Sequence, residues 1–282
     1  MGEKADDKSE YAMGLPQAHL IAYFDMLGYK KAVENNEKEY FGKFVRAMLS
    51  LHLNMHTVYA TDLIRYLKEP IEYNPIKYKV FSDNIVLYCP FPSDNNSKNV
   101  LLYRMADSCL NIQCHFSRIG IPIRGAITVG NISANKDVIF GAGLIRAVDL
   151  ERIAKYPRII IDTIIETDNL SYVQVMHDGE WLFLDYLSYY YLRQANINRM
   201  PEKERKALEK LYENLQHQYS GIGNTNVDNH DYTGQLNSFL CRHKELVESM
   251  ANNGEIVEKY NWLKSYHNAF AHDHGYEELT VI

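Results

Sequence analysis

The sequence predicts an α+β protein with a ferredoxin-like βαββαβ core and a mainly helical C-terminal appendage. Up to residue 129, β-rich apolar runs alternate with helix-periodic segments in the order strand, helix, hairpin, helix, strand. A sheet with both helices on one face is the simplest way to bury these elements. We therefore expect a polar lead-in at residues 1–17, a core domain at 18–165 and the appendage at 166–282.

A change in the spacing of apolar residues predicts the first strand and the first helix. Residues 19–24 form a short apolar run that stops at Asp25, as a buried strand does. From Tyr29 onward, apolar residues recur every three or four positions, which predicts a long helix that ends before Pro70.

A hairpin and a second helix follow. Two β-rich runs, at 76–81 and 85–89, flank a Ser-Asp-Asn break, so Asp83 is expected at the hairpin tip. A helix is predicted from about residue 99 to 118, and Gly120 is expected to terminate it.

The remaining elements extend the core and form the appendage. The next segments are predicted as a strand at 121–129, a helix at 141–155 and a strand at 158–162 that adds to the same sheet. Beyond about residue 166, helices are predicted at 181–193, 201–218 and 234–268, joined by breaks rich in Gly, Asn and Asp.

Composition excludes several classes of protein. The net charge of −6 argues against general binding of nucleic acids, because no domain-wide basic field attracts their phosphates. The four cysteines have no CxxC spacing, and the N-terminal residues have no apolar run typical of a signal peptide. No apolar run is long enough to span a bilayer, so we expect a cytoplasmic protein that binds no membrane.

Two carboxylates are the strongest candidates for chemistry. Asp25 and Asp83 are predicted at the ends of strands that can lie side by side in this fold. Two carboxylates held close together repel each other unless a cation lies between them, and Mg²⁺ prefers carboxylate oxygens together with substrate phosphates. Alternatively, Asp25 caps the following helix and Asp83 makes the hairpin turn.

The segment after Asp25 favours phosphate binding. Residues 24–29 place backbone amides and a helix N-terminus directly after the carboxylate, which suits the β- and γ-phosphates of a nucleotide. Lys30 and Lys31 add positive charge there, or lie on a solvated helix face.

These segments resemble the catalytic domain of class III nucleotidyl cyclases. Residues 24–29 (Phe-Asp-Met-Leu-Gly-Tyr) are similar to the first metal motif of that family, and residues 79–83 (Lys-Val-Phe-Ser-Asp) to its second. Residues 124–130 resemble the strand that follows, and Phe140-Gly141 with Ala147 and Glu151 resembles the next helix. The likeness covers about residues 18–163, so the predicted core domain corresponds to a nucleotide cyclase domain.

The resemblance implies a homodimer with active sites at its interface and two bound Mg²⁺ or Mn²⁺ ions. Asp25 and Asp83 would ligate the metals, and the Met26 carbonyl would complete the second site. Substrate-binding positions implied by the resemblance are Phe24, Leu27, Gly28, Tyr29, Lys30, Lys79 and Arg124. Two roles stay open for Arg124: contact with a phosphate or with the partner subunit, and a structural role at a strand edge.

The sequence departs from the family at the base pocket. Lys79 occupies the position of a base-recognising lysine, but its expected partner Asp is Val138. The family's transition-state Asn would fall at Ile145 and its Arg at Asp149. We assign Arg146 as the catalytic residue that would supply the missing cation, with Arg152 as the alternative. Each could equally be an ordinary arginine on the helix surface.

These departures and the helical appendage make the chain resemble a Pycsar pyrimidine cyclase. The resemblance implies a uridylate cyclase, with CTP as the second choice of substrate. Its product, cyclic UMP or cyclic CMP, would be sensed by a separate effector in bacterial antiviral (anti-phage) defence. Two alternatives stay open: an adenylate or guanylate cyclase with a remodelled base pocket, and a catalytically inactive cyclase-fold nucleotide sensor.

Overall fold

The computed structural model describes residues 13–56, 75–166, 170, 173–179, 181–199, 202, 206, 236–251 and 257–282. The strands are β1 (Gln17–Met26), β2 (Lys77–Phe81), β3 (Asn84–Pro90), β4 (Ile123–Ala134), β5 (Ile139–Phe140), β6 (Ile159–Ile161), β7 (Val175–Asp178) and β8 (Trp181–Leu184). The helices are α1 (Tyr29–His56), α3 (Asn95–Arg118), α4 (Ala142–Ala154), α5 (Tyr186–Arg199), α7 (Leu236–Ala251) and α8 (Val257–Asp273), followed by a short 3-10 turn, η4 (Glu277–Leu279).

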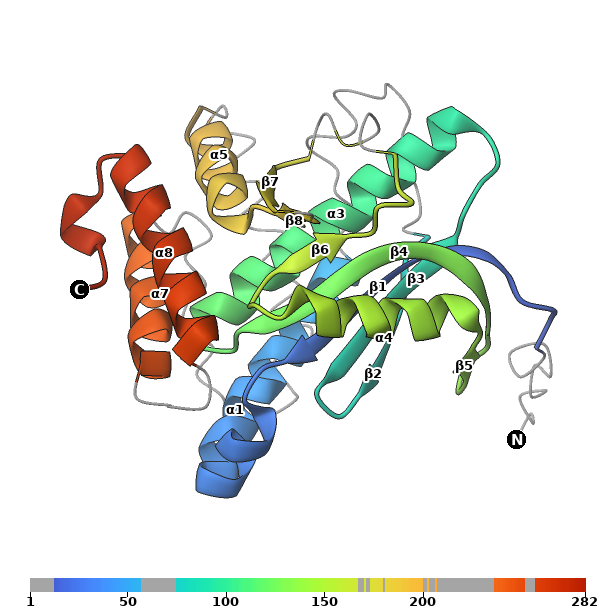
Figure 1. The fold of residues 1–282 in the computed structure, drawn as a ribbon, viewed down its shortest axis with the longest axis horizontal. Helices are drawn as coiled ribbons and strands as arrows, with labels where there is room; N and C mark the ends of the chain where they lie inside the picture. Colours follow the sequence, from blue (N-terminus) through green and yellow to red (C-terminus); the bar gives the residue numbers. More distant parts are fainter. Residues whose placement is uncertain are drawn as a thin grey trace.

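One mixed sheet organises the described part of the chain (Figure 1). Its strand order is β2-β3-β1-β4-β6-β8-β7, with β5 paired to β4. The four strands of the predicted βαββαβ unit are neighbours in the order β2-β3-β1-β4 and all antiparallel, which confirms the ferredoxin-like core. The predicted additional strand is also confirmed, because β6 pairs with β4, in parallel.

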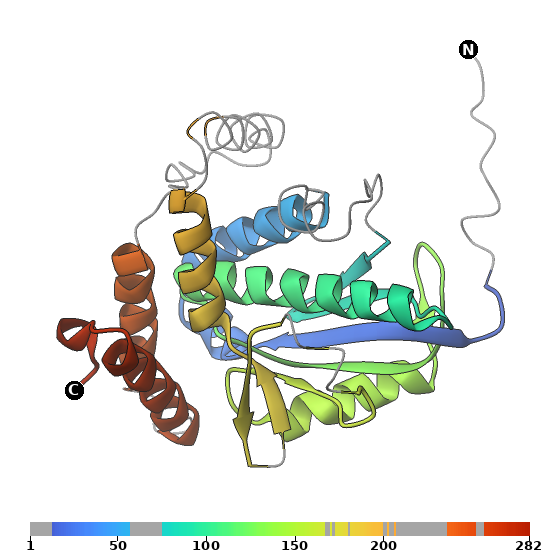
Figure 2. The ribbon, with the colours of Figure 1, turned by 90° about the horizontal axis from the view of Figure 1, so that it is seen from above.

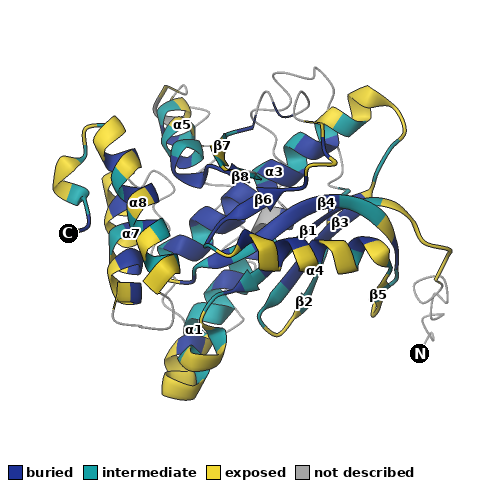
Figure 3. Ribbon diagram, in the orientation of Figure 1, coloured by how far each residue is buried: buried dark blue, intermediate teal, exposed yellow. Residues whose placement is uncertain are grey.

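Helices cover both faces of the sheet. Figure 2 shows α1 and α3 on one face, as predicted, and α4 on the other. The side chains of β1 alternate accordingly: Leu20, Ala22 and Phe24 belong to the core under α1 and α3, whereas Ile21 belongs to a smaller core with Ala147 of α4. The dark strands at the centre of Figure 3 are therefore buried from both sides.

Helix α1 consists of two segments. Asn36 has an extended backbone (φ −157°, ψ 77°) inside the helix. Its side-chain carbonyl accepts a hydrogen bond from the Glu39 amide at 3.2 Å, so Asn36 acts as an N-cap for the longer second segment. The first segment therefore forms a separate unit that begins at Tyr29, next to the end of β1.

Helix α4 approaches β4 through two glycines. A Cβ atom added to Gly143 would lie 2.7 Å from the backbone carbon of Gly130, and one added to Gly130 would lie 2.5 Å from the Cα of Gly143. Both contacts are with backbone atoms, which cannot rotate away. These positions let the helix reach the sheet closely enough to cover its second face.

The predicted helix at 181–193 is wrong in its first four residues. Trp181–Leu184 is strand β8, which pairs with β6 and β7. Gly179, with φ +64°, turns the chain between β7 and β8, and the Asp185 side chain accepts a hydrogen bond from the Ser188 amide at 3.1 Å. Helix α5 therefore begins after an Asp N-cap, a signal that the apolar period alone does not reveal.

The two C-terminal helices largely coincide with a segment predicted to be helical. Helices α7 and α8 fall within the predicted helical segment 234–268, although α8 continues to Asp273. The helix predicted at 201–218 lies outside the described residues except for 202 and 206. Within the described ranges, no helix has both the length and the apolar character needed to cross a bilayer.

A buried chain of hydrogen bonds joins α5, α7 and α8. The Tyr186 hydroxyl bonds Nε2 of His243, His243 Nδ1 lies 2.9 Å from Nδ1 of His267, and His267 Nε2 lies 2.9 Å from the Leu279 carbonyl oxygen. Since the carbonyl only accepts, His267 Nε2 carries a proton and its Nδ1 accepts from His243. All these bonds are satisfied when both imidazoles are neutral, and both rings are fully buried.

We expect the fold to lose stability as the pH falls below about 6.5. Burial, and secondarily His267, lowers the pKa of His243 well below its usual value; burial also lowers that of His267. The unfolded chain then binds more protons than the folded one, so unfolding is favoured by up to about 1.4 kcal/mol per histidine for each pH unit below about 6.5. Urea denaturation at pH 7.5 and pH 5.5 measures the effect.

The exposed His272 supplies the control for this prediction. Its imidazole pairs with Glu277 at the surface, so His272→Asn should retain the wild-type pH dependence. His243→Gln should reduce that dependence, whatever it does to stability at neutral pH. Equal free energies of unfolding for the wild-type protein at the two pH values would contradict the expectation.

Candidate active site

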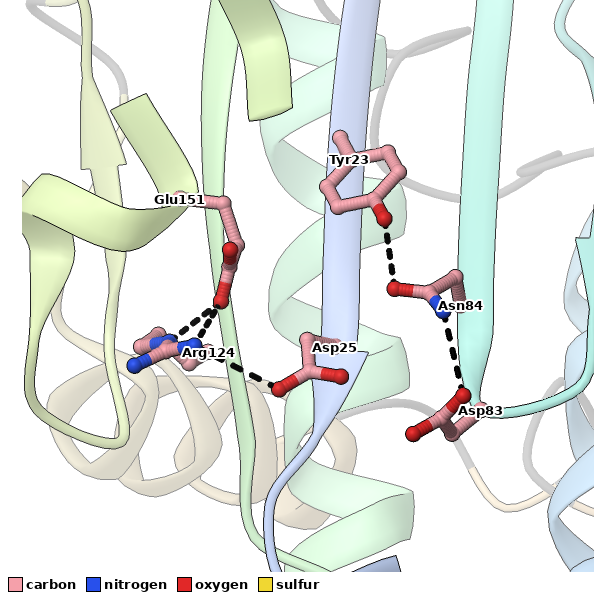
Figure 4. Close-up of polar contacts among 6 residues, drawn as sticks. All are labelled: Tyr23, Asp25, Asp83, Asn84, Arg124 and Glu151. Carbon is pink, nitrogen blue, oxygen red and sulfur yellow. Dashed lines mark hydrogen bonds and ion pairs between the residues drawn. The ribbon is translucent and has the colours of Figure 1, made fainter. Parts of the chain in front are cut away.

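The two candidate carboxylates lie on neighbouring strand ends. Asp25 is the penultimate residue of β1, and its partner across the sheet is Asn84, the first residue of β3. The Met26 amide donates to the Asp83 carbonyl oxygen at 3.0 Å, which ties the end of β1 to the hairpin turn. Figure 4 shows Asp25 and Asp83 side by side on these two strands. Sheet register therefore determines how far apart the carboxylates lie.

Polar side chains also hold the hairpin end. The Tyr23 hydroxyl donates to Asn84 Oδ1 at 2.5 Å, and Asn84 Nδ2 donates to Asp83 Oδ1 at 3.1 Å (Figure 4). Ser82 begins the two-residue turn with a positive φ of 58°. This chain of contacts orients the Asp83 carboxylate from the neighbouring strand.

Arg124 bridges two carboxylates on the other side of Asp25. Its side chain pairs with Glu151 of α4, and its Nη2 lies 3.5 Å from Asp25 Oδ2 (Figure 4). All three side chains are largely buried, with exposed fractions of 17% for Arg124, 23% for Asp25 and 6% for Glu151. The guanidinium thus contacts a candidate metal ligand directly, in addition to joining β4 to α4.

Burial makes negative charge costly at this site. Desolvation raises the pKa of Asp25, opposed by Arg124 and reinforced by Asp83. Desolvation likewise raises the pKa of Glu151, with Arg124 opposing and Asp25 adding to the rise. The pKa of Tyr23 rises to about 12, first from burial and then from the same carboxylates. An added cation would stabilise the ionised carboxylates here.

The N-terminus of α1 follows directly after the carboxylate pair. Gly28 has φ +81°, a conformation that L side chains rarely adopt, and the first intrahelical bond runs from the Ala32 amide to Gly28 O at 3.0 Å. The amides of Gly28, Tyr29 and Lys30 precede that bond, as expected for the anion-binding end of a helix. The Leu27 amide is engaged, because it donates to Pro122 O at 2.9 Å.

The other side chains of this segment differ in exposure. Phe24 is fully buried in the main core, so its contribution to a ligand site would come through the backbone. Tyr29 packs edge-on against Tyr40 with ring centroids 5.5 Å apart. The Lys30 side chain is 86% exposed and lies 3.9 Å from Glu34, as a solvated helix-face lysine does.

Tyr40 is a site neighbour that sequence patterns did not indicate. Its ring is buried, and its hydroxyl has no hydrogen-bond partner among the described residues. Burial raises its pKa to about 12, and Tyr29, Asp83 and Asp25 add to the rise. A buried hydroxyl beside two carboxylates has an unused donor for a bound ligand or water.

Lys79 and Arg146 lie in other polar contacts. Lys79 Nζ on β2 donates to the Lys136 carbonyl oxygen at 2.6 Å, which links the hairpin to the loop after β4. Arg146 forms a two-pronged ion pair with the buried Asp162, including an Nη2–Oδ1 bond of 2.7 Å. Neither basic side chain contacts Asp25 or Asp83 within the described part of the chain.

Comparisons with known proteins give a weak structural likeness. No protein-family profile and no curated protein matches the chain. One similar solved structure is the catalytic core of a rhodopsin-guanylyl cyclase with converted specificity, in complex with ATPalphaS. The two sequences are 11% identical, the TM-score is 0.42, and the match covers 61% of this chain and 97% of that chain. Another is the monomeric guanylyl cyclase domain of the RhoGC fusion protein from the aquatic fungus Blastocladiella emersonii. The sequences are 10% identical, the TM-score is 0.37, and the match covers 61% of this chain and 95% of that chain.

Proposed function

We propose that the chain is a metal-dependent nucleotide cyclase that converts a nucleoside triphosphate into its 3′,5′-cyclic mononucleotide and pyrophosphate. The observation that carries the proposal is the pair of carboxylates, Asp25 and Asp83, held on adjacent strand ends directly before a helix N-terminus. Such a pair next to first-turn amides provides oxygen ligands for cations and donors for phosphate at one place.

The residues present fit one or two Mg²⁺ or Mn²⁺ ions that also bind substrate oxygens. Asp25, Asp83 and the Met26 carbonyl would hold them, and the cations would relieve the cost of burying the Asp25 carboxylate. Across the described residues, no three His, Cys, Asp or Glu side chains gather closely enough to hold a metal alone. Substrate phosphates would therefore complete the coordination, as is usual for Mg²⁺. When bound, such ions acidify the 3′-hydroxyl and stabilise the departing pyrophosphate.

The chain itself would bind and orient the triphosphate. Amides at the start of α1, from Gly28 to Lys30, would donate to phosphate oxygens, and Arg124 would hold the Asp25 carboxylate in place. In the reaction, the 3′-hydroxyl would lose its proton to water, and its oxygen would bond to the α-phosphorus while the bond from that phosphorus to the bridging oxygen of pyrophosphate breaks. No covalent intermediate with the protein is needed.

UTP is the proposed substrate, with CTP second, and the proposed setting is bacterial anti-phage signalling through a separate effector. This part of the proposal rests on the sequence resemblance to pyrimidine cyclases. We also propose a homodimer. Large apolar side chains exposed on β5 and α4 support a protein partner on that face, since Phe140 and Ile145 are 65% and 66% exposed.

One observation favours a catalytically inactive nucleotide sensor as the second candidate. Arg146, the cation proposed to replace the family's transition-state arginine, is held by the buried Asp162. An arginine neutralised in this way stabilises developing charge less well than an unpaired one. A sensor would bind nucleotide without turnover.

Incubation with ATP, GTP, CTP and UTP in turn, with Mn²⁺ and with products resolved by mass spectrometry, tests the proposal. A cyclic UMP or cyclic CMP product is the expected result. Cyclic AMP or GMP would retain the cyclase and overturn the pyrimidine specificity. Absence of any cyclic product, together with measurable nucleotide binding, would favour the sensor.

A further inference from the structure

Helix α8 begins beside the C-terminal end of α4. Glu258, in its first turn, pairs with Lys155 Nζ at 2.6 Å, and Lys155 directly follows α4. Glu151, the partner of Arg124, lies one turn earlier on α4. Figure 1 shows the beginning of α8 turned toward this end of α4. The appendage therefore reaches the part of the core that carries the site.

Aromatic contacts fix the orientation of α8 at this end. The Trp262 ring stacks on Tyr156, with centroids 5.5 Å apart and planes 4° from parallel. Its Nε1 donates to Asp178 Oδ2 at 3.0 Å, and the same carboxylate pairs with Arg158 at 2.5 Å. The first turns of the helix are thus anchored to the segment between α4 and β6 and to β7.

Lys259 lies on the buried face of α8. Leu263, Tyr266 and Phe270 form a buried stripe at helical spacing. Lys259 precedes Leu263 by four residues, so its side chain continues this stripe at the end nearest the site. Its exposure is intermediate, in contrast to the exposed Glu258 beside it. The stripe therefore changes from apolar to cationic at the end of α8 that contacts α4 through Glu258 and Lys155.

The electrostatics agree with this placement. Burial lowers the pKa of Lys259, Arg124 lowers it further, and Asp25 and Glu151 oppose the change. In the other direction, Lys259 is among the charges that lower the pKa of Asp25. Lys259, about one helical turn before the buried Leu263, thus lies within the electrostatic influence of Asp25 and Glu151.

We propose that α8 supplies Lys259 as a phosphate-binding residue of this site, in the same chain as Asp25. This inference rests on the proposed function and extends it, because it gives the C-terminal appendage a part in substrate binding. A partly desolvated ammonium offers up to three donors and a full positive charge, which suits the β- and γ-phosphates and then the departing pyrophosphate. Sequence patterns do not indicate this role, because Lys259 lies far along the chain from every cyclase-like segment.

Binding of inorganic pyrophosphate with Mn²⁺, measured by isothermal titration calorimetry on the full chain, tests the inference without requiring turnover. Lys259→Met should weaken binding about tenfold or more, because it removes one charge from a partly buried site. Lys259→Arg should stay within about threefold of wild type. Lys264→Met is the matched control: Lys264 lies on the same helix, 5.8 Å over the Tyr260 ring, and should bind as wild type does. Thermal melting of each variant establishes that it is folded.

The outcomes separate this inference from the cyclase itself. Wild-type pyrophosphate affinity in Lys259→Met overturns the role of Lys259, whether or not the protein cyclises nucleotides. Weakened binding in that variant, with no cyclic product from any triphosphate, supports Lys259 and overturns the cyclase. A wild-type protein that binds no pyrophosphate overturns the phosphate-binding role outright.

Discussion

Asp25→Asn and Asp83→Asn are each expected to lower the rate of cyclic nucleotide formation by roughly a hundredfold or more, about 3 kcal/mol in the transition state. Asparagine keeps the size of each side chain but removes the charge that would hold a cation. The Asp25 variant should stay folded, because burial already disfavours its charged form and Arg124 retains Glu151 as a partner. Rates and Mn²⁺ binding, measured together, distinguish lost metal from lost fold.

Glu245→Gln is the control for these variants. This carboxylate is exposed on α7 and pairs only loosely with Arg242, at 3.4 Å. Neutralising it changes the net charge by the same amount as the active-site substitutions, and it should leave rate and metal binding unchanged. A wild-type rate in either Asp25→Asn or Asp83→Asn would show that the assigned carboxylate does not hold a metal needed for the reaction.

Gly143→Val is expected to destabilise the fold by about 3 kcal/mol or more. The new side chain would meet the backbone of Gly130 and the Ile21 Cδ1 atom, each 2.7 Å from its Cβ. The Ile21 side chain can move, but the backbone contact relaxes only if α4 separates from β4. That separation would expose the smaller core beneath α4 and displace Glu151 from Arg124. Urea denaturation gives the change in the free energy of unfolding.

Gly42→Ala provides the comparison. Gly42 lies in the second segment of α1, has no positive φ, and an added Cβ would meet nothing within 4 Å. Alanine there should stabilise the fold by about 0.5–1 kcal/mol, because it reduces the freedom of the unfolded chain. Similar unfolding free energies for Gly143→Val and wild type would contradict the proposed close contact of α4 with β4.

The core was predictable because its signals are local. Apolar runs that end at Asp25 and at the Ser82-Asp83 turn mark strand ends, and the βαββαβ order leaves few ways to arrange them. Strand β8 was not predictable from apolar period, because Trp181–Leu184 is a four-residue apolar run that fits a helix as well as a strand. Its identity depends on pairing with β6, which is a tertiary contact.

The candidate site was predictable only in part, because several of its contacts are tertiary. Asp25 and Asp83 lie next to recognisable turns, so their neighbourhood follows from the fold. The contacts of Arg124 with Glu151, the buried Tyr40 hydroxyl and the approach of Lys259 join positions distant in the sequence. No periodicity or short motif encodes such pairs, because they depend on how α1, α4 and α8 pack around the end of β1.

The interruption of α1 at Asn36 separates the helical hydrogen bonding of its two segments. Helical hydrogen bonding is cooperative only along a continuous ladder, and an extended residue breaks that ladder. The two turns that follow Gly28 can therefore tighten around an anion, or fray in its absence, at a cost confined to their own few bonds. The longer segment, whose Ala47 and Leu51 are buried in the core, keeps its packing in both cases. A ligand-dependent change in this helix would therefore be confined to the short segment before Asn36, which begins next to the end of β1.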